Sequence, residues 1–252
     1  GTLFGGDTGS MDGLSALFVV IISVGAVAAV LYSRGYLAHC LAEKSPAHIS
    51  LHYTALVAMF YAMLGVVLSD GGFSFLFFWE LMTVASFLLI LFDAQRREVR
   101  RAALSYLIMM HIGFVLLVIG FVRLDAACGA ATFGTLGDYF RTQPGLPLLL
   151  VFLAGFGMKA GLFPMHVWLP EAHPAAPSHV SALMSGVMIK TGVYGILRVT
   201  AALGEQPLLH TAGVILLAAG VVTGLWGVIL AAVQNDVKRL LAYSSIENVG
   251  VI

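Results

Sequence analysis

The segment FGMKAGLFPMHVWLPEAHPA (residues 156–175) places a lysine, a helix-breaking proline and two histidines inside a strongly apolar region. Lys159 stands five residues before Pro164, and proline lacks an N–H and clashes with the preceding turn of a helix. Gly157 and Gly161 flank the lysine and leave room for water or for a neighbouring backbone. The segment therefore predicts a helix that is broken near Lys159–Pro164.

The chain as a whole is too apolar for a water-soluble domain. Of its 252 residues, 60% are hydrophobic and only 10% are charged, and the mean hydropathy is +0.96. Soluble domains carry roughly 25% charged residues, and a globule of this size cannot hide such an excess of apolar side chains. The formal net charge is zero, which argues against nucleic acid as a partner. The composition predicts a lipid bilayer as the solvent.

The cysteines and the chain ends give less information. Cys40 and Cys128 are far apart and match no metal-binding spacing, and the sequence has no cysteine cluster or nucleotide-binding loop. We therefore expect no cofactor and no metal in this chain. The sequence begins with Gly1, shows no signal peptide, and ends at Ile252 inside an apolar run. We interpret it as a fragment of a longer protein.

The apolar runs predict an all-α, polytopic membrane helix bundle that forms a single transmembrane domain over residues 1–252. A bilayer core needs about 20 apolar residues per helix, and the runs are continuous rather than alternating, which argues against strands. A short surface helix is predicted at Leu136–Phe140 in the long mixed connector. The eight predicted spans are residues 14–32, 53–69, 73–92, 102–122, 146–168, 180–199, 211–233 and 240–252.

Lysine and arginine in the connectors predict the orientation. Cytoplasmic connectors of membrane proteins carry an excess of these residues. The connectors after the first, third and seventh spans hold more of them than the connectors on the other side, so they are expected to face the cytoplasm and Gly1 to lie outside. The first group is Arg34, Lys44, Arg96, Arg97, Arg100, Arg101, Lys238 and Arg239, and the second is Arg123, Arg141 and Arg198.

Three ionisable residues fall well inside the predicted spans: Glu80, Lys159 and Lys190. Such a group at the bilayer centre costs about 2.5–3.5 kcal/mol on insertion scales, so each needs a partner, a cavity or water. A structural ion pair is the simplest interpretation, but two lysines and one glutamate leave one charge unpaired. The alternative is a proton relay, in which Glu80 lies near Lys159 and a change in their separation alters how tightly the lysine holds its proton.

The histidines extend this prediction. We expect His111, in the middle of a span, and His166, just after the break, to take part in the relay, although a lone membrane histidine is often a hydrogen-bonded core residue. His173, His179 and Glu171 are predicted to connect the relay with the cytoplasmic side, the alternative being that the histidines cap helix ends. Haem ligation by a histidine pair is disfavoured because no second histidine is expected at a matching depth on another long span.

Three motifs together resemble the family of antiporter-like, proton-conducting membrane subunits. They are FFWELMTVASFLLI (77–90), GFGMKAGLFPMHVWLPEAHPAAPSHVSALMSGVMIKTGVYGILRV (155–199) and NDVKRLLAYSSIENVG (235–250). This family occurs in respiratory complex I, in multisubunit Na⁺/H⁺ antiporters and in membrane-bound nickel–iron hydrogenases. The second and third motifs are most similar to the hydrogenase-4 and formate hydrogenlyase branch.

The resemblance implies a role for each buried charge. Glu80 matches the family's glutamate on the helix before the channel, Lys159 matches the lysine of the broken helix, and Lys190 matches the lysine of the central hydrophilic axis. The family fold has about fourteen helices in two inverted five-helix repeats. This sequence would hold the first repeat, from roughly Tyr53 to Val199, and the opening of the second.

The resemblance also implies partners and a mechanism. Other membrane subunits and a hydrophilic redox arm, of hydrogenase or NADH-dehydrogenase-like type, would drive proton or sodium movement through this subunit in a bacterial or archaeal inner membrane. Three alternatives stay open: a subunit of a multisubunit Na⁺/H⁺ antiporter without redox coupling, a non-conducting structural membrane anchor, and a membrane enzyme with its own metal.

Overall fold

The computed structural model describes residues 2–3, 7–8, 11–40 and 44–252, and Gly1, whose predicted place is outside the membrane, lies beyond this described part. Two-residue strands β1 (Thr2–Leu3) and β2 (Asp7–Thr8) pair antiparallel ahead of the helices. The helical segments are α1 (Gly13–Cys40), α2 (Pro46–Leu68), α3 (Gly72–Ile90), η1 (Leu91–Asp93), α4 (Arg97–Cys128), η2 (Phe133–Thr135), α5 (Leu136–Thr142), α6 (Gly145–Ala160), η3 (Met165–Trp168), α7 (Leu169–Ala175), α8 (Ser178–Leu183), η4 (Met184–Met188), α9 (Ile189–Ala201), α10 (Pro207–Ala232) and α11 (Val237–Val251).

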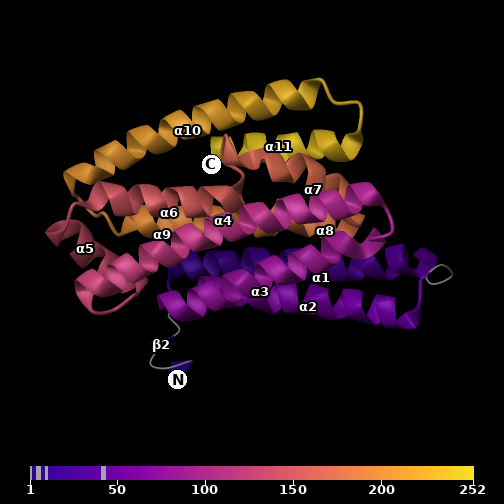
Figure 1. Cartoon of the computed structure of the whole chain (residues 1–252), viewed down its shortest axis with the longest axis horizontal. Helices are drawn as coiled ribbons and strands as arrows, with labels where there is room; N and C mark the ends of the chain where they lie inside the picture. The colour runs from indigo at the N-terminus through magenta and orange to yellow at the C-terminus, as the bar shows by residue number, and fades with distance from the viewer. Residues whose placement is uncertain (1, 4–6, 9–10, 41–43) are drawn as a thin grey trace.

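The prediction of an all-α membrane bundle is confirmed. Within the described residues, seven stretches are long and apolar enough to cross a membrane, and Figure 1 shows their helices side by side. The short helix predicted at Leu136–Phe140 is present as α5. The eighth predicted span corresponds to α11, which has 15 residues within this sequence.

Several helices extend beyond the apolar runs that predicted them. α2 begins at Pro46 rather than at Tyr53, because Ser45 caps the helix by accepting a hydrogen bond from the N–H of His48 and proline is favourable at the first helical position. α4 begins at Arg97, in the polar segment ahead of the apolar run. Long basic side chains at a helix end can reach the membrane surface, so polar residues do not end these helices.

The centre of the bundle is formed by α3, α4, α6 and α9. The rings of Trp79 on α3 and Phe156 on α6 lie edge to face with centroids 5.5 Å apart, a favourable aromatic geometry. α6 and α9 approach closely at Gly192, where an added Cβ would lie 2.6 Å from the backbone nitrogen of Ala160. A small residue at this position therefore fixes how α9 lies against the end of α6.

The two ends of the bundle differ in charge. At one end, on the right of Figure 1, α1, α3, α7 and α10 finish and α2, α4, α8 and α11 begin. We call this the basic end; its basic residues include Lys44, Arg96, Arg97, Arg100, Arg101, Lys238 and Arg239. At the opposite end, Arg198 of α9 bonds to Asp12, which precedes α1. The predicted asymmetry of lysine and arginine is therefore present in the fold.

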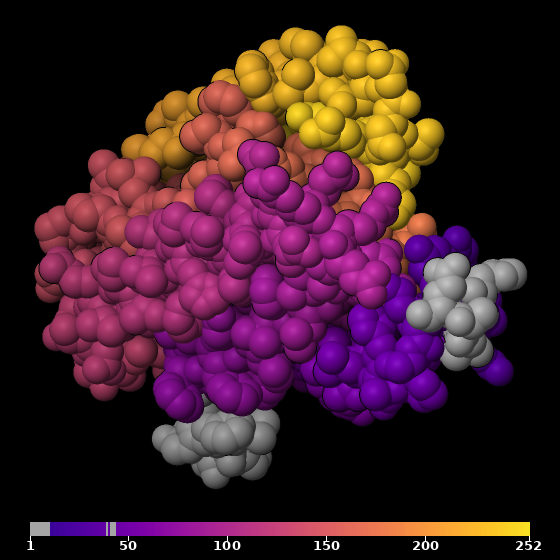
Figure 2. Space-filling model, turned by 45° about the vertical axis from the view of Figure 1, so that its right-hand side comes forward, coloured from indigo at the N-terminus to yellow at the C-terminus, as the bar shows by residue number. Residues whose placement is uncertain are grey.

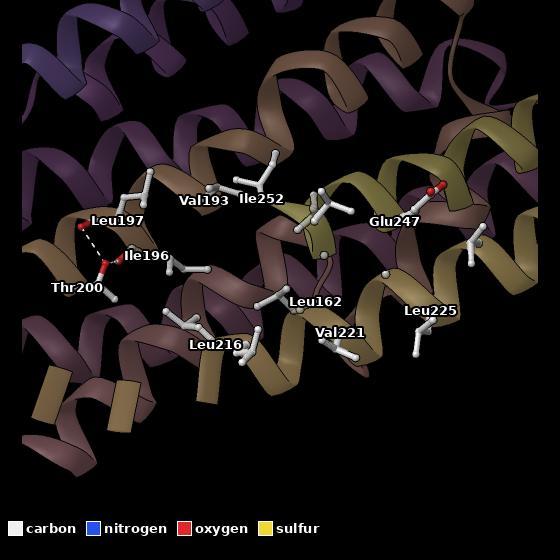
Figure 3. Close-up of a pocket in the computed structure, with 17 residues that line it drawn as sticks. Leu162, Val193, Ile196, Leu197, Thr200, Leu216, Val221, Leu225, Glu247 and Ile252 are labelled. Atoms are coloured by element: carbon white, nitrogen blue, oxygen red, sulfur yellow. Dashed lines mark hydrogen bonds between the residues drawn. The ribbon is translucent and has the colours of Figure 1, made fainter. Parts of the chain in front are cut away.

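α10 and α11 pack against each other at one edge of the molecule, which Figure 2 shows in yellow. The pair is close because glycines meet across it: a Cβ on Gly227 would lie 2.6 Å from the backbone nitrogen of Glu247. Between this pair and α9 lies an apolar groove of about 760 Å³, in which Thr200 and Glu247 are among the few polar residues (Figure 3). None of the predicted relay residues lines this groove.

Candidate functional site

Lys159 lies in the last turn of α6 and is only 1% exposed. Its Nζ donates a hydrogen bond to Oγ1 of Thr83 on α3 at 2.9 Å. The same Nζ lies 5.2 Å from the ring centre of Trp79 and 5.9 Å from that of Tyr106, both within reach of a cation–π interaction. The lysine is thus enclosed between α3, α4 and α6 and does not face lipid.

Glu80 precedes Thr83 by one helical turn, but its carboxylate is paired with another residue. Its Oε1 lies 3.1 Å from Nε2 of His111 on α4, and its buried Oε2 has no hydrogen-bond partner among the described residues. The charge of Glu80 still acts on Lys159 through space. The Thr83 hydroxyl thus binds the lysine, and His111 binds the carboxylate.

His111 lies at the outer surface of the bundle. Its side chain is 50% exposed, and its Nδ1 lies 2.9 Å from the carbonyl oxygen of Leu107. It also lines a shallow apolar groove along α4. The predicted mid-span position holds, but the only charged partner of His111 among the described residues is Glu80, on a different helix. A relay role for His111 stays a prediction.

Lys190 is only partly buried, and its Nζ donates to the carbonyl oxygen of Ser185. Ser185 belongs to η4, a single turn of π-helix between α8 and α9. Such turns shift the hydrogen-bonding register of a helix and occur frequently at functional sites. The structure thus places Lys190 directly after an irregular turn, which its sequence did not indicate.

Three polar side chains that the sequence analysis did not single out lie between Lys159 and η4. The hydroxyl of Tyr106 faces Thr83 and Ser86, and both Tyr106 and Ser86 contact the sulfur of Met188 in η4. Ser86 and Thr83 each donate to a carbonyl one turn earlier on α3. The spacing along α3 could have predicted Thr83 and Ser86, because residues 80, 83 and 86 lie three positions apart and therefore share one face of the helix.

The predicted break in the fifth span is confirmed, and it begins at Gly161. α6 ends at Ala160, and Gly161 has a φ of 79°, a left-handed conformation that glycine adopts without strain. Pro164 follows at the start of η3, after a cis peptide bond with Phe163. We expected Gly161 to leave space for water or a neighbouring backbone. Its left-handed backbone conformation is the stronger reason for a glycine at this position.

The backbone of the break is bonded within the protein. Nε1 of Trp168 donates to the carbonyl oxygen of Met158 at 3.0 Å, and the N–H of Phe163 donates to Oγ1 of Thr223 on α10 at 3.0 Å. Unpaired backbone groups at membrane depth cost several kcal/mol each. The hydrogen bonds to the Trp168 indole and the Thr223 hydroxyl therefore offset the cost of the non-helical backbone.

His166, directly after the break, is buried and bonded to α10. Its Nε2 accepts a hydrogen bond from Nε1 of Trp226 at 3.1 Å, and its ring stacks on Phe163 with centroids 5.6 Å apart. Its Nδ1 is buried without a hydrogen-bond partner among the described residues. His166 is thus not in direct contact with Lys159, and its relay role stays a prediction.

The predicted access residues all lie at the basic end. His173 is buried and its Nδ1 lies 2.7 Å from Oγ of Ser181. Glu171 lines a polar cavity of about 560 Å³ together with Arg96 and Arg239. Lys238 donates to the carbonyl oxygen of Ala176 at 2.9 Å, which attaches α11 to the connector between α7 and α8.

His179 has a partner that the sequence analysis missed. Its Nε2 lies 2.7 Å from Nε2 of His52 on α2, and both rings are buried. The expectation that no second histidine lies at a matching depth on another helix was wrong, because the partner lies 127 positions away in the sequence. A metal held between two imidazoles needs bonds of about 2 Å to each nitrogen, so this direct contact leaves no room for one between these atoms. The described residues contain no group of three or more histidine, cysteine or acidic side chains placed to hold a metal ion.

Comparisons with known proteins agree with this geometry. Residues 69–252 match the family described as "NADH:quinone oxidoreductase/Mrp antiporter, TM". The chain is 39% identical over 250 residues to "Hydrogenase-4 component B" of Escherichia coli (strain K12), covering 96% of this chain and 36% of that protein. It is 34% identical over 247 residues to "Putative antiporter subunit mnhA2" of Staphylococcus aureus (strain MRSA252), covering 96% of this chain and 30% of that protein.

A solved structure shares the arrangement of helices. The Mrp complex from Dietzia sp. DQ12-45-1b contains a chain that superimposes with a TM-score of 0.85 at 27% identity, covering 96% of this chain and 26% of that one. This chain spans only about a third of the length of the curated relatives that it matches. The family match includes the broken helix and the three ionisable residues Glu80, Lys159 and Lys190, so the chain is a multi-pass membrane protein that belongs to the NADH:quinone oxidoreductase/Mrp antiporter transmembrane family.

Proposed function

We propose that this chain belongs to a proton-translocating membrane subunit of a hydrogenase-4/formate-hydrogenlyase-type or complex-I-like respiratory complex. The observation that carries the proposal is Lys159, an ionisable side chain that is fully enclosed where a membrane helix breaks. Such residues are costly in a membrane and mark ion pathways, and broken helices near the midplane are where transporters build their ion sites. The 39% identity to hydrogenase-4 component B supports this type of complex.

The contacts around Lys159 suggest how its proton is controlled. The Thr83 hydroxyl stabilises the ammonium form by accepting its hydrogen bond, and the nearby charge of Glu80 stabilises it further. A change that draws the Glu80 carboxylate farther from Lys159 weakens this second effect, and the lysine then releases its proton. The hydroxyls of Ser86 and Tyr106 contact Met188 in η4. Lys190, which follows η4 and binds the Ser185 carbonyl, receives the proton in this scheme.

The proposed setting follows from the charge asymmetry and from the relatives. The basic end faces the cytoplasm because lysine and arginine are retained on that side, and the membrane is the inner membrane of a bacterium or archaeon. Other membrane subunits and a hydrophilic redox arm, of hydrogenase or NADH-dehydrogenase-like type, are the partners. Electron transfer in that arm supplies the change at Glu80.

A second candidate is a subunit of a multisubunit Na⁺/H⁺ antiporter without redox coupling. The similarity to the putative antiporter subunit of Staphylococcus aureus and to the Mrp complex favours it. The same buried lysine would serve, with sodium on part of the path. Sodium-dependent proton movement in vesicles without any electron donor supports this candidate, whereas donor-dependent proton uptake supports the respiratory complex.

Lys159→Met tests the proposal in the complete protein, assembled in its native membrane. Methionine fills a similar volume without a titratable group, so the complex is expected to assemble while donor-driven proton uptake by inverted vesicles is lost. Arg141→Met is the control, since Arg141 is an exposed cation that pairs with Asp138 on α5, apart from the relay. Unchanged uptake per assembled complex in Lys159→Met would contradict the proposal and favour a non-conducting membrane anchor.

A further inference from the structure

His52 and His179 form a buried contact at the basic end of the bundle; we call them the histidine pair. His52 lies in the second turn of α2 and is 4% exposed, and His179 lies in the first turn of α8 and is 2% exposed. Their Nε2 atoms are 2.7 Å apart, which is a hydrogen-bond distance. One ring must donate and the other accept, so a single proton lies between the two Nε2 atoms.

The surroundings of the histidine pair are mainly aromatic. Tyr36 of α1 lies 5.3 Å from His179 and Phe92 of η1 lies 4.9 Å from His52, measured between ring centroids. Within the described part of the chain, neither imidazole forms a salt bridge with a carboxylate. The titratable and charged groups that face the pair are Tyr36 from α1, His48 and Tyr53 from α2, the Lys44–Asp93 pair beside Phe92, and Lys238 from α11.

Packing alone does not account for the histidine pair. Buried polar pairs pay a desolvation cost, and replacing them by well-packed apolar side chains is often neutral or stabilising. Nδ1 of His179 is buried and has no hydrogen-bond partner among the described residues, which is unfavourable for folding. His179 also lines a cavity of about 740 Å³ between α1 and α8, where Tyr32 and Ser178 supply hydroxyl groups. The rest of the lining is apolar, so Tyr32, Ser178 and His179 form its polar part.

We propose that the histidine pair is a proton-transfer element between the basic end and the buried lysines. This inference rests on the proposed function and adds His52, on a helix to which that function assigns no role. A proton binds Nδ1 of one ring, the proton on its Nε2 crosses the 2.7 Å bond to Nε2 of the other ring, and that ring releases the proton from its own Nδ1. One proton enters and one leaves, and the two rings have exchanged tautomers. The rings must reorient before the next transfer in the same direction, so the pair passes one proton at a time.

The helix that carries His179 continues towards the relay. α8, η4 and α9 follow one another without a gap, and Lys190 lies 11 positions after His179. At a rise of 1.5 Å per residue this separation is about 16 Å, which a file of water molecules must cover. The Ser185 carbonyl that binds Lys190 lies on the same stretch.

The test is the variant His52→Gln in the complete protein within its native complex, with donor-driven proton uptake measured in inverted vesicles per assembled complex. Glutamine keeps a hydrogen-bonding group near His179 but cannot accept and release a proton in sequence, so uptake is expected to fall at least about tenfold. His210→Gln is the control, because His210 is an exposed histidine of α10 at the opposite end. Should His52→Gln assemble poorly, His179→Gln leaves α2 unchanged and serves the same purpose.

The double variant separates a proton-transfer role from a structural one. If the two imidazoles act as a unit, His52→Gln and His179→Gln together lower uptake no further than either one alone. A purely structural pair lowers the amount of assembled complex but leaves uptake per complex unchanged, and this result would overturn the inference. If Lys159→Met abolishes uptake while His52→Gln does not, the proposed function stands and the inference about the histidine pair fails. If neither variant lowers uptake, both fail.

Discussion

The hydrogen bond from Lys159 to Thr83 supports a quantitative prediction. Thr83→Val replaces the hydroxyl by a methyl group of nearly the same shape, so the packing of α3 against α6 is retained while the 2.9 Å bond is lost. No other hydrogen bond of Nζ is present among the described residues. A hydrogen bond to a charged group contributes about 1.5–3 kcal/mol. Since 1.36 kcal/mol is a factor of ten, the balance between ammonium and amine at Lys159 is expected to change by about 10- to 150-fold.

The assay for Thr83→Val is the initial rate of donor-driven proton uptake by inverted vesicles, normalised to the amount of assembled complex. We expect at least a tenfold lower rate near neutral pH. Without the bond that stabilises its ammonium form, the lysine spends most of its time as the neutral amine and has no proton to pass on. Thr83→Ser is the matched control, since serine keeps the hydroxyl and should retain most of the rate. Equal rates for the valine and serine variants would show that the hydroxyl does not set the proton equilibrium of Lys159.

Three further predictions concern stability. Gly192→Ala brings a Cβ to 2.6 Å from the α6 backbone, so the helices must separate at a cost of about 1–3 kcal/mol, and thermal unfolding in detergent should begin several degrees lower; an unchanged transition would refute this. Thr223→Val leaves the N–H of Phe163 without its acceptor and should destabilise by about 1–3 kcal/mol, whereas Thr223→Ser should not. Asp12 lies just outside the first span, where burial raises its pKa, but hydrogen bonds from a backbone N–H and from Arg198 lower it more and hold the pKa below its usual value of 3.8. The resulting stabilisation is fully present above the usual value and is lost as the pH falls through the lower native value; Asp12→Asn should therefore cost less than about 1 kcal/mol at pH 7, and the difference from the parent protein should vanish in acid.

The helices of the fold could be predicted from local features of the sequence. The length of each apolar run predicted a span because a bilayer imposes that length, and a glycine and a proline after Lys159 predicted the break because each has restricted or special backbone geometry. Helix ends were less predictable. Polar residues at the start of α2 and α4 end an apolar run without ending a helix, so both helices begin earlier than expected.

The partners of the buried charges could not be predicted in the same way. α3 is apolar around most of its circumference, so its sequence does not reveal which face points inward. Packing orients it so that Thr83, rather than Glu80, meets the lysine, and it leaves the carboxylate to His111. Both residues lie on α3, and only the rotation of that helix selects between them.

Depth in the membrane and contact between helices thus have different origins. That Glu80, Lys159 and Lys190 lie within the bilayer follows from the apolar residues on either side of each. That Lys159 binds a hydroxyl 76 positions earlier, and His179 a histidine 127 positions earlier, follows from the way the helices pack side by side. A run of residues encodes the length of its own helix, but the neighbours of a side chain come from helices whose order and rotation are set by the packing of the whole bundle.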